Sequence, residues 1–196
     1  LSYYQFDVQV QLGQPYRITR IEQVARTIPA FTTVEGWLGA QALRIRDDGA
    51  KSDPLSVTAL NANSEMVSPT LSQGRWLLPE DQNAIVLSQN VLSAEPDIQV
   101  GDPITLEIGD KESTWVVVGI AQVLGGPPNV IPVYVNYPYF SWLTADMNRA
   151  TSAQLKLDPA AGLTQDEAAE LLNDRLEAAG YEVISVFTID TLRRFT

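Results

Sequence analysis

Residues 153–187, AQLKLDPAAGLTQDEAAELLNDRLEAAGYEVISVF, decide the fold, because their pattern predicts a strand, a helix and a second strand. In 153–157 the apolar side chains occupy alternate positions, which is typical of a half-buried strand. Asp158-Pro159 ends this strand, since proline has no backbone N–H to donate to a sheet. Residues 181–187 return to an extended, largely apolar pattern, which predicts the second strand.

The helix between these strands has recognisable start and stop signals. Thr164 and Glu167 have the spacing of a capping box, in which each side chain accepts a hydrogen bond from a backbone amide of the first turn. Gly180 is placed to take the left-handed conformation that closes a helix. One apolar face of the predicted helix consists of Ala168, Leu172, Leu176 and Ala179.

The N-terminal end of the chain repeats the same order. Residues 6–12 alternate like a strand, residues 18–28 have apolar side chains at helical spacing before Pro29, and residues 31–45 resume an extended pattern. Two such strand–helix–strand units can pair into one four-stranded sheet with both helices on one face, a ferredoxin-like arrangement. The sequence therefore predicts an α+β fold whose base is built from both ends of the chain.

The middle of the chain has a different pattern, of short strands separated by Asp, Gly, Pro and Ser. Three strands are predicted there, over 84–87, 104–108 and 115–120. This pattern predicts a small β-rich lobe inserted into the base. The predicted boundaries are 1–62 for the N-terminal half of the base, 63–127 for the lobe and 128–196 for the C-terminal half of the base.

A linker is predicted around the boundary at residue 127, where the chain returns from the lobe to the base. Residues 125–129, GGPPN, form the plainest linker in the chain. Residues 130–135 predict a strand that returns to the base, and 139–144 predict a short helical turn. We expect its aromatic side chains, Phe140 and Trp142, to be buried.

Composition excludes several classes of protein. Histidine and cysteine are both absent, so Ser-His-Asp and Cys-His nucleophiles, the common zinc sites and disulfides cannot be built. The formal net charge is −11, with 13 Lys and Arg against 24 Asp and Glu, which disfavours nucleic acid and anionic headgroups as partners. No apolar run approaches the roughly 18–20 residues of a membrane span, and no signal peptide is recognisable. We therefore expect this segment to be soluble.

Paired carboxylates can carry out general acid–base catalysis or hold a hard cation. Adjacent pairs occur at Asp47-Asp48, Glu80-Asp81 and Asp166-Glu167. Each pair has a local explanation: a hairpin turn, an acidic turn, and a first helical turn that favours negative charge. The lysines lie in turns or an exposed strand, where a protonated amine is a poor base, and no phosphate-binding loop is present. The sequence therefore predicts no enzyme activity, no catalytic or metal site and no cofactor.

Acidic residues are concentrated between Arg75 and Gly125. Eight acids stand there against two basic residues, Arg75 and Lys111. The acids are Glu80, Asp81, Glu95, Asp97, Asp102, Glu107, Asp110 and Glu112. Two interpretations are open: a solvated surface of strands and turns, or an acidic patch that meets a basic partner.

A particular order of short motifs runs through the predicted lobe. The motifs are Gly74-Arg75-Trp76, the acidic turn Glu80-Asp81, the strand 84–88, Val100-Gly101-Asp102 before a strand at 104–106, and the strand 115–120 with Trp115 and Gly119. In this order, and flanked by the two strand–helix–strand ends, the chain resembles the MacB-like periplasmic core domain of FtsX-type ABC transporter permeases. The resemblance covers essentially the whole chain.

This resemblance implies a base, or porter, that carries an inserted β-rich lobe, or sabre. It places the domain outside the cytoplasmic membrane, between the first and second transmembrane helices, with residues 1–4 leaving one span and residues 188–195 leading to the next. It also implies that ATP is hydrolysed by a cytosolic subunit or domain and that the permease transmits the motion to this domain. The implied partners are the ATPase, a second permease copy or paralogue, an exported substrate and, often, a periplasmic adaptor. The lobe is shorter here than in the longer forms.

We interpret the residues that carry the resemblance as structural. Gly74 and Gly101 are expected to supply positive φ angles, and Asp102 to accept hydrogen bonds from nearby amides. Trp76 and Trp115 are expected to anchor the core of the lobe. The alternative to a permease domain is a free-standing extracellular binding module, and an enzyme is the third possibility.

Overall fold

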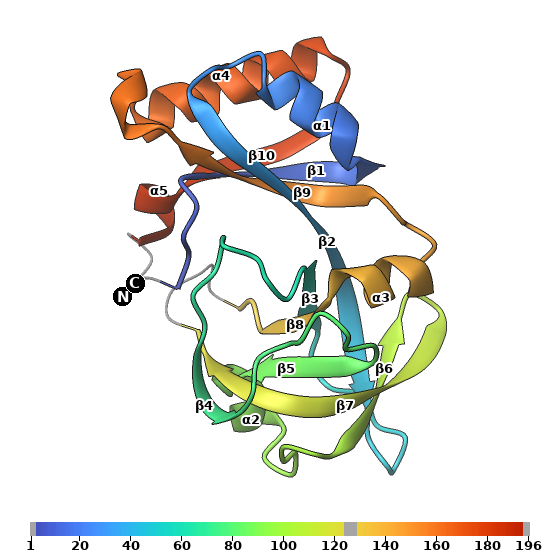
Figure 1. The fold of residues 1–196 in the computed structure, drawn as a ribbon. Helices are drawn as coiled ribbons and strands as arrows, with labels where there is room; N and C mark the ends of the chain where they lie inside the picture. Colours follow the sequence, from blue (N-terminus) through green and yellow to red (C-terminus); the bar gives the residue numbers. More distant parts are fainter. Residues whose placement is uncertain (1–2, 124–128, 194–196) are drawn as a thin grey trace.

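The computed structural model describes residues 3–123 and 129–193, which form two parts joined by one long strand (Figure 1). Most of the predicted linker at 125–129 lies outside the described residues. The strands are β1 Val8–Arg17, β2 Phe31–Ile45, β3 Leu55–Leu60, β4 Thr70–Gly74, β5 Ala84–Ser88, β6 Pro103–Ile108, β7 Lys111–Gln122, β8 Pro132–Asn136, β9 Arg149–Leu157 and β10 Val183–Thr188. The helices are α1 Ile18–Ala25, α2 Gln89–Ala94, α3 Tyr137–Leu143, α4 Gln165–Ala178 and α5 Ile189–Arg193, with a 3-10 turn at Pro159–Ala161.

The base consists of β1, β9, β10 and the first half of β2. Its strands lie in the order β10-β1-β9-β2, and each neighbouring pair is antiparallel. Val8 is the register partner of Leu155 on one side and of Thr188 on the other. The prediction that the two ends of the chain pair into one sheet is therefore confirmed. Helices α1 and α4 both cover the upper face of this sheet (Figure 1).

The local signals around α4 act as the sequence predicts. The Thr164 hydroxyl accepts a hydrogen bond from the Glu167 amide at 3.2 Å, and the Glu167 carboxylate accepts one from the Thr164 amide at 2.8 Å. Gly180 closes the helix with φ +87°. Alternate residues of the sheet and one face of each helix then form the core of the base. Its fully buried members include Val8, Val10, Ile21, Ala25, Leu155, Leu172 and Leu176.

Strand β1 is longer than predicted, and α1 is shorter. The sequence predicts that the strand ends before Gly13, whereas β1 continues to Arg17 with a shift of register against β9 between Gln11 and Tyr16. Pro15 lies inside this irregular stretch, where a missing N–H costs no regular ladder bond. Helix α1 ends at Ala25, and a turn then leads to β2.

The lobe is a closed ring of six strands. The second half of β2 pairs with β3, β3 with β8, β8 with β5, β5 with β7, β7 with β6, and β6 with β2 again. Strand β2 therefore belongs to both parts: Phe31–Trp37 pair with β9, whereas Leu38–Ala42 pair with β3. The inside of the ring is filled by a second core that includes Leu38, Val57, Ile85, Leu87, Leu106, Trp115, Val117, Val133, Val135 and Phe140.

Three predictions about the lobe are wrong. The strand at 130–135 exists as β8, but it pairs with β3 and β5 in the lobe and does not return to the base. A continuous apolar strand fits any buried position, so its pattern could not identify its neighbours. Helix α2 interrupts a stretch in which only strands and turns were predicted. The third concerns Trp142, which is 63% exposed, because it lies two residues from buried Phe140 and so on another face of α3.

These pairings bear on the predicted division of the chain. Strands β3 and β8 lie within residues assigned to the base, at 1–62 and 128–196, yet both pair inside the ring. Whether base and lobe unfold as separate units remains a prediction.

Candidate functional site

The two described ends of the chain meet in a third apolar cluster between the base sheet and the ring. We call this cluster the junction; its buried members are Tyr3, Phe6, Trp37, Leu60, Met66, Val67, Leu77, Ala84, Val86, Ala121, Tyr134 and Ile189. Tyr3 and Phe6 come from the N-terminal segment, and Ile189 is the first residue of α5. Figure 1 shows both ends leaving the molecule on the same side, at the height of the junction. The junction therefore contains residues from both described ends of the chain as well as residues of the lobe.

Asp7 connects the ends to the base. Its carboxylate accepts a hydrogen bond from the Leu157 amide at 2.7 Å and another from the Gln165 side chain at 3.1 Å. Its carbonyl oxygen accepts one from the Ile189 amide at 2.9 Å. One residue at the start of β1 therefore holds the end of β9, the start of α4 and the start of α5.

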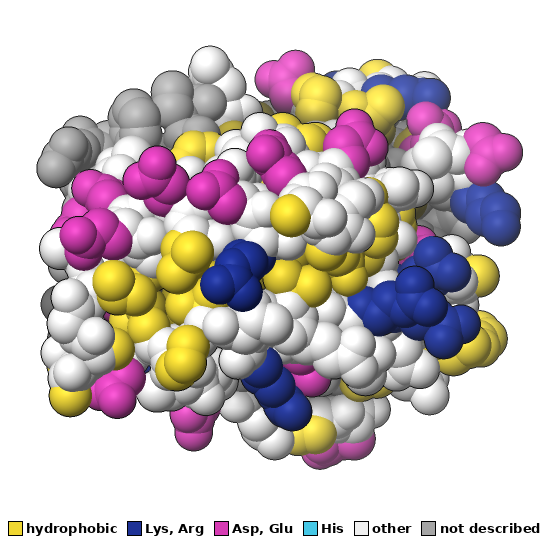
Figure 2. Space-filling model, turned by 90° about the horizontal axis from the view of Figure 1, so that it is seen from above, with side chains coloured by type: hydrophobic (Ala, Val, Ile, Leu, Met, Phe, Trp, Pro, Cys, Tyr) yellow, Lys and Arg dark blue, Asp and Glu magenta, His cyan; other side chains and the backbone are white. Residues whose placement is uncertain are grey.

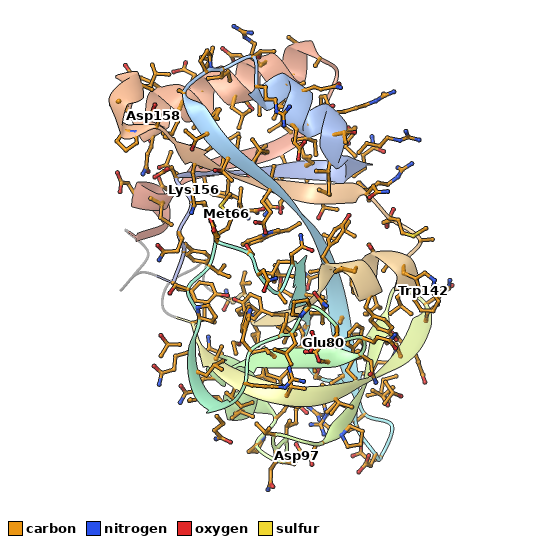
Figure 3. The ribbon with its side chains drawn as sticks, in the orientation of Figure 1. Met66, Glu80, Asp97, Trp142, Lys156 and Asp158 are labelled. Carbon is orange, nitrogen blue, oxygen red and sulfur yellow. The ribbon has the colours of Figure 1, made fainter. Side chains whose placement is uncertain are left out.

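The N-terminal segment is also connected to the lobe. The Gln5 amide donates to the Met66 carbonyl at 2.9 Å, the Ser68 amide donates to the Tyr3 carbonyl at 2.8 Å, and Tyr4 and Val67 form an isolated antiparallel bridge. Figure 3 places Met66 in this region, below the base sheet. The segment thus lies like a short extra strand against the chain that precedes β4.

Aromatic rings fill the middle of the junction. Tyr3 contacts Tyr4 edge-on, with ring centroids 4.9 Å apart, and lies 5.8 Å from the ring of Tyr134. Trp76 contacts the same Tyr134 at 5.4 Å. Burial raises the pKa of Tyr3 and of Tyr134 above its ordinary value of 10, so both phenols stay neutral. Trp76 is only half-buried and packs on the junction, whereas the sequence predicted it in the core of the lobe.

The Gly74-Arg75-Trp76 motif shapes the turn that brings Trp76 to the junction. Gly74 has φ +67° and is the register partner of Gly119; a Cβ atom on Gly74 would lie 2.2 Å from the Val118 carbonyl oxygen. Only glycine fits there. Arg75 forms a two-bonded ion pair with Asp81, at 2.7 and 3.0 Å.

Buried Asn136 supports the same acidic turn from the other side. Its side-chain amide donates to the carbonyl oxygens of Leu78, Pro79 and Asp81, at 3.2, 3.1 and 2.9 Å. The Asp81 carboxylate also accepts from the Leu78 amide at 2.8 Å. Asn136 is a structural residue that sequence reasoning missed, and no local signal identifies a contact that spans 55 residues or more.

The second motif, Val100-Gly101-Asp102, is structural as well. Gly101 has φ +99° and donates its amide to the Val117 carbonyl at 2.7 Å. The Asp102 carboxylate accepts from the Gln99 amide at 2.8 Å, which confirms the predicted turn. Val100 is partly exposed. Trp115 is fully buried in the core of the lobe, as predicted, and its indole donates to the Ser113 hydroxyl at 2.8 Å.

A partly buried ion network lies at the far end of the lobe, and sequence reasoning missed it. Glu95, whose side chain is 2% exposed, bonds to Arg44 at 2.5 Å and to Arg46. Asp97 forms two further bonds with Arg44, at 2.9 and 2.6 Å. Hydrogen bonds from the arginines, those from Arg46 first, lower the pKa of Glu95, and those from Arg44 lower the pKa of Asp97 to about 2.

The pairing of these acids bears on the two interpretations of the acidic stretch. Four of its eight acids are committed to ion pairs within the chain: Asp81, Glu95, Asp97 and Glu107. Asp102 accepts a local backbone bond. A solvated and internally paired surface therefore explains these acids better than a patch for a basic partner.

Two acids of the remaining adjacent pairs accept local backbone hydrogen bonds. Asp48 accepts from the Ala50 amide at 2.9 Å and Glu167 caps α4, so both have the local roles predicted for them. No group of three or more acidic side chains in residues 3–123 and 129–193 is arranged to hold a metal ion. Within the same ranges, no helix is long and apolar enough to cross a membrane.

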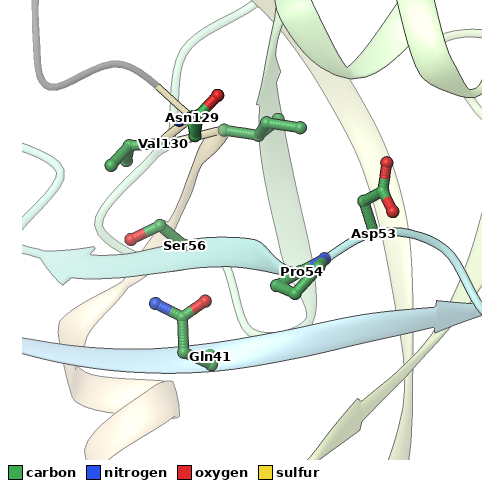
Figure 4. Close-up of a pocket in the computed structure, with 7 residues that line it drawn as sticks. Gln41, Asp53, Pro54, Ser56, Asn129 and Val130 are labelled. Atoms are coloured by element: carbon green, nitrogen blue, oxygen red, sulfur yellow. The ribbon is translucent and has the colours of Figure 1, made fainter.

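One surface cavity, of about 310 Å³, lies on the outside of the ring (Figure 4). Its lining residues are Gln41, Asp53, Pro54, Ser56, Asn129, Val130 and Ile131. Asp53 is its single ionisable group, so the cavity offers no acid–base pair and no nucleophile with a partner. The junction, and not this cavity, is the part of the molecule whose arrangement indicates a function.

Comparison with known proteins identifies the fold. The sequence matches no family model and no curated protein. The structure is similar to the periplasmic region of MacB from Actinobacillus actinomycetemcomitans, with a TM-score of 0.62 and 12% identity over 98% of this chain and 92% of that one. It is also similar to the extracellular domain of the noncanonic ABC-type transporter YknZ from Gram-positive bacteria, with a TM-score of 0.57, 14% identity, and 91% and 99% of the chains covered.

A third similar structure is a domain of a protein assigned as a permease from Porphyromonas gingivalis, with a TM-score of 0.51 and 12% identity over 95% of this chain and 91% of that one. The low identities mean that these likenesses establish a shared fold. Their high coverage means that the whole chain, base and lobe together, takes part in it. The chain therefore has the same fold as the periplasmic region of MacB, which is the fold that the resemblance of the lobe motifs and of the two strand–helix–strand ends implied.

Proposed function

We propose that this chain is the extracytoplasmic domain of an ABC transporter permease, and that it couples ATP hydrolysis in the cytosol to movement of a substrate outside the membrane. The observation that carries the proposal is the fold, since all three similar structures are outer or permease domains and are covered over 91% or more of their length. The proposed partners are an ATPase, reached through the rest of the permease, and a second permease copy or paralogue. An exported substrate, with or without an adaptor, completes the set.

The arrangement of the junction supports this proposal. A domain that is driven by membrane helices needs its two ends close together and firmly bound to the parts that move. Here Asp7 joins the ends to the base sheet, and the Tyr4–Val67 bridge joins the N-terminal segment to the lobe. Displacing Tyr3 or Ile189 would therefore shift base and lobe relative to each other, which is the coupling by rigid-body movement that we propose.

The first test is the sequence on either side of this segment in its gene. The proposal expects an apolar span of about 20 residues shortly before Leu1 and another soon after Thr196. If neither span is encoded, the transporter function is excluded and a free-standing extracellular binding module becomes the better explanation.

The second test uses the absence of cysteine from this chain. Tyr4→Cys with Val67→Cys, made in a full-length permease without other cysteines, would place two thiols on bridge partners, at a separation that a disulfide can span. Because the proposal requires the N-terminal segment to stay bound to the lobe, we expect the oxidised double variant to keep the ATPase activity of the purified permease–ATPase complex. Tyr4→Cys alone is the matched control. A several-fold fall in activity on oxidation, restored by reduction, would show that the contact has to open and that the segment and the lobe do not move together.

A further inference from the structure

An exposed group of apolar and basic side chains lies at the waist of the molecule, between the base and the lobe. We call it the waist face; it consists of Trp142, Met147, Arg17, Arg20 and Arg149. Trp142 is 63% exposed and Met147 is 60% exposed, and the three arginines are exposed as well. Figure 3 shows Trp142 pointing away from the body at the end of α3. Apolar side chains exposed singly are ordinary, whereas two large ones on one short connection form a local apolar patch.

These side chains are held together by one compact turn. The turn joins α3 to β9, with the Ala145 amide donating to the Trp142 carbonyl at 3.2 Å and the Arg149 amide donating to the Asp146 carbonyl at 3.1 Å. The start of α1 joins the same turn, because the Ile18 amide donates to the Asn148 carbonyl at 2.9 Å. The ring of Trp142 rests on Tyr139, with centroids 5.8 Å apart. The waist face is therefore built on a hydrogen-bonded frame.

The backbone of this turn is strained on both sides of Met147. Ala145 and Asn148 each have φ +60°, and they are two of the three residues other than glycine with positive φ in the described chain. The left-handed conformation is unfavourable for an alanine, because its Cβ crowds the backbone. Such strain persists where surrounding contacts require it, and it is common where a side chain is presented to a partner.

The charges of the waist face are arranged unfavourably for the isolated domain. Arg17 and Arg149 are direct register partners on β1 and β9, and Arg20 lies one helical turn beyond Arg17. Like charges directly opposite each other destabilise a sheet. In the ion pairs of the described chain the basic partners are Arg44, Arg46, Lys51 and Arg75, and no arginine of the waist face is among them.

Acidic side chains lie near this surface without neutralising it. Asp146 belongs to the turn and is half-buried, and Glu22 lies on α1. Neither forms an ion pair with Arg17, Arg20 or Arg149 in the described structure. Seen from above the helices, basic side chains gather towards one side of the molecule, whereas acidic ones line much of another (Figure 2). The basic side is thus a local exception on a chain of net charge −11.

We propose that the waist face binds an acidic polypeptide segment that carries at least one large apolar side chain. Carboxylates of the segment pair with the guanidinium forks of Arg17 and Arg149, which removes the repulsion between them. The apolar side chain packs on Trp142 and Met147, since tryptophan, methionine and arginine are the side chains most enriched at binding surfaces. Binding of the segment displaces water from the arginines and from the apolar pair at the same time.

A membrane surface fits the same features less well. In Figure 1 the two ends of the chain leave on one side of the waist, whereas α3 and its turn lie on the other. An anionic bilayer would also meet the acidic surface around the waist face, because lipid charge is spread over a plane. A polypeptide segment contacts the arginines alone, within the roughly 8 Å over which charges act at physiological ionic strength.

The test uses the purified domain and a library of random 12-residue peptides displayed on phage. We expect selection to enrich peptides with net negative charge and at least one Trp, Phe, Leu or Met. The best peptide, once synthesised, should be titrated into the domain by calorimetry. Its Kd should rise at least tenfold with Arg17→Glu, with Trp142→Ala, and when salt is raised from 50 to 300 mM.

Lys111→Glu is the matched control, because it makes the same change of charge at an exposed site in the lobe. It should leave the Kd within about twofold, and the melting temperature of each variant shows whether it is folded. Enrichment of neutral or basic peptides, equal binding to all variants, or no enrichment at all would overturn the proposal. Binding to vesicles with 30% phosphatidylserine that depends on Trp142 and Arg17, without binding of acidic peptides, would assign the surface to a membrane instead. None of these outcomes bears on the proposed transport function, which is tested separately.

Discussion

The base and the lobe both have apolar cores, but they use charged side chains in opposite ways. In the base, two carboxylates accept hydrogen bonds from backbone amides at the ends of elements: Glu167 at the start of α4 and Asp7 at the end of β9. In the lobe, Glu95 is buried to 2% exposure and holds two arginines. A helix cap stabilises one turn, whereas a buried ion network commits the elements that it joins to one another. The lobe should therefore be the part that a change of charge or of pH disrupts.

Removing the buried carboxylate should have the largest effect. In Glu95→Ala, Arg44 keeps Asp97 but loses its buried partner, so we expect a loss of about 3–5 kcal/mol in the free energy of unfolding. Urea denaturation measures it. The control is Glu107→Ala, which breaks the more exposed pair with Lys51 and should cost less than about 1 kcal/mol.

The same variant tests whether base and lobe are separate folding units. Hydrogen exchange should accelerate between Ala84 and Ile120, while the amides of α4 keep their protection. Equal acceleration in both regions would mean that the strand β2, which both parts share, makes them one cooperative unit. The predicted boundaries at 63 and 127 would then have no energetic meaning.

Substitution of Gly74, in the turn that leads to Trp76, should cause the next largest loss in the free energy of unfolding. Gly74→Ala introduces a left-handed alanine and places its Cβ against the Val118 carbonyl oxygen, so we expect a loss of about 2–4 kcal/mol. Gly101→Ala is the matched control, since Gly101 also has positive φ but open space around its Cβ position. It should cost about 1–2 kcal/mol. If the two variants unfold at the same urea concentration, the close approach of β4 and β7 at Gly74 adds nothing to the cost of the substitution.

The parts of the fold that the sequence predicted are those fixed by neighbours along the chain. The capping box at Thr164, the left-handed glycines and the alternation in β1 and β9 are all set within a few residues. The ion network is different, because Arg44 and Glu95 are 51 residues apart. The only signal was the spacing of two between Arg44 and Arg46 and between Glu95 and Asp97, which is too common to identify a partner.

The candidate site was predicted less well than the fold, for a related reason. The junction is assembled from both ends and from the lobe, so no single stretch of sequence contains it. Trp76 was placed in the wrong cluster because burial can be predicted from residue type, whereas the choice of neighbours depends on how two sheets meet. The resemblance of the motif order implied the fold of the whole chain, but neither it nor the residue patterns predicted the junction.

Lowering the pH should destabilise the lobe before the base, with a smaller effect than the substitutions above. Arg46 and Arg44 lower the pKa of Glu95 below its ordinary 4.5, and that of Asp97 falls to about 2. A carboxylate whose pKa is lowered by folding stabilises the protein above its unfolded pKa and loses that contribution as the pH falls through the folded one. Between about pH 4.5 and 2 the melting temperature should therefore fall, and exchange in the lobe should accelerate first. Glu95→Gln should make this pH dependence shallower, and an unchanged slope would mean that other carboxylates cause it.

The smallest effect should come from the helix cap of the base. Thr164→Ala removes the hydroxyl that accepts from the Glu167 amide, and such a cap contributes about 1 kcal/mol. Exchange should accelerate in the first turn of α4 and remain unchanged in β5, β6 and β7, because the cap touches no residue of the ring. Thr164→Ser keeps the hydroxyl and should behave like the parent chain. Acceleration in the ring would require a path through Gln165 and Asp7 to the junction, and would show that the base governs the lobe through the same residues that bind the ends of the chain.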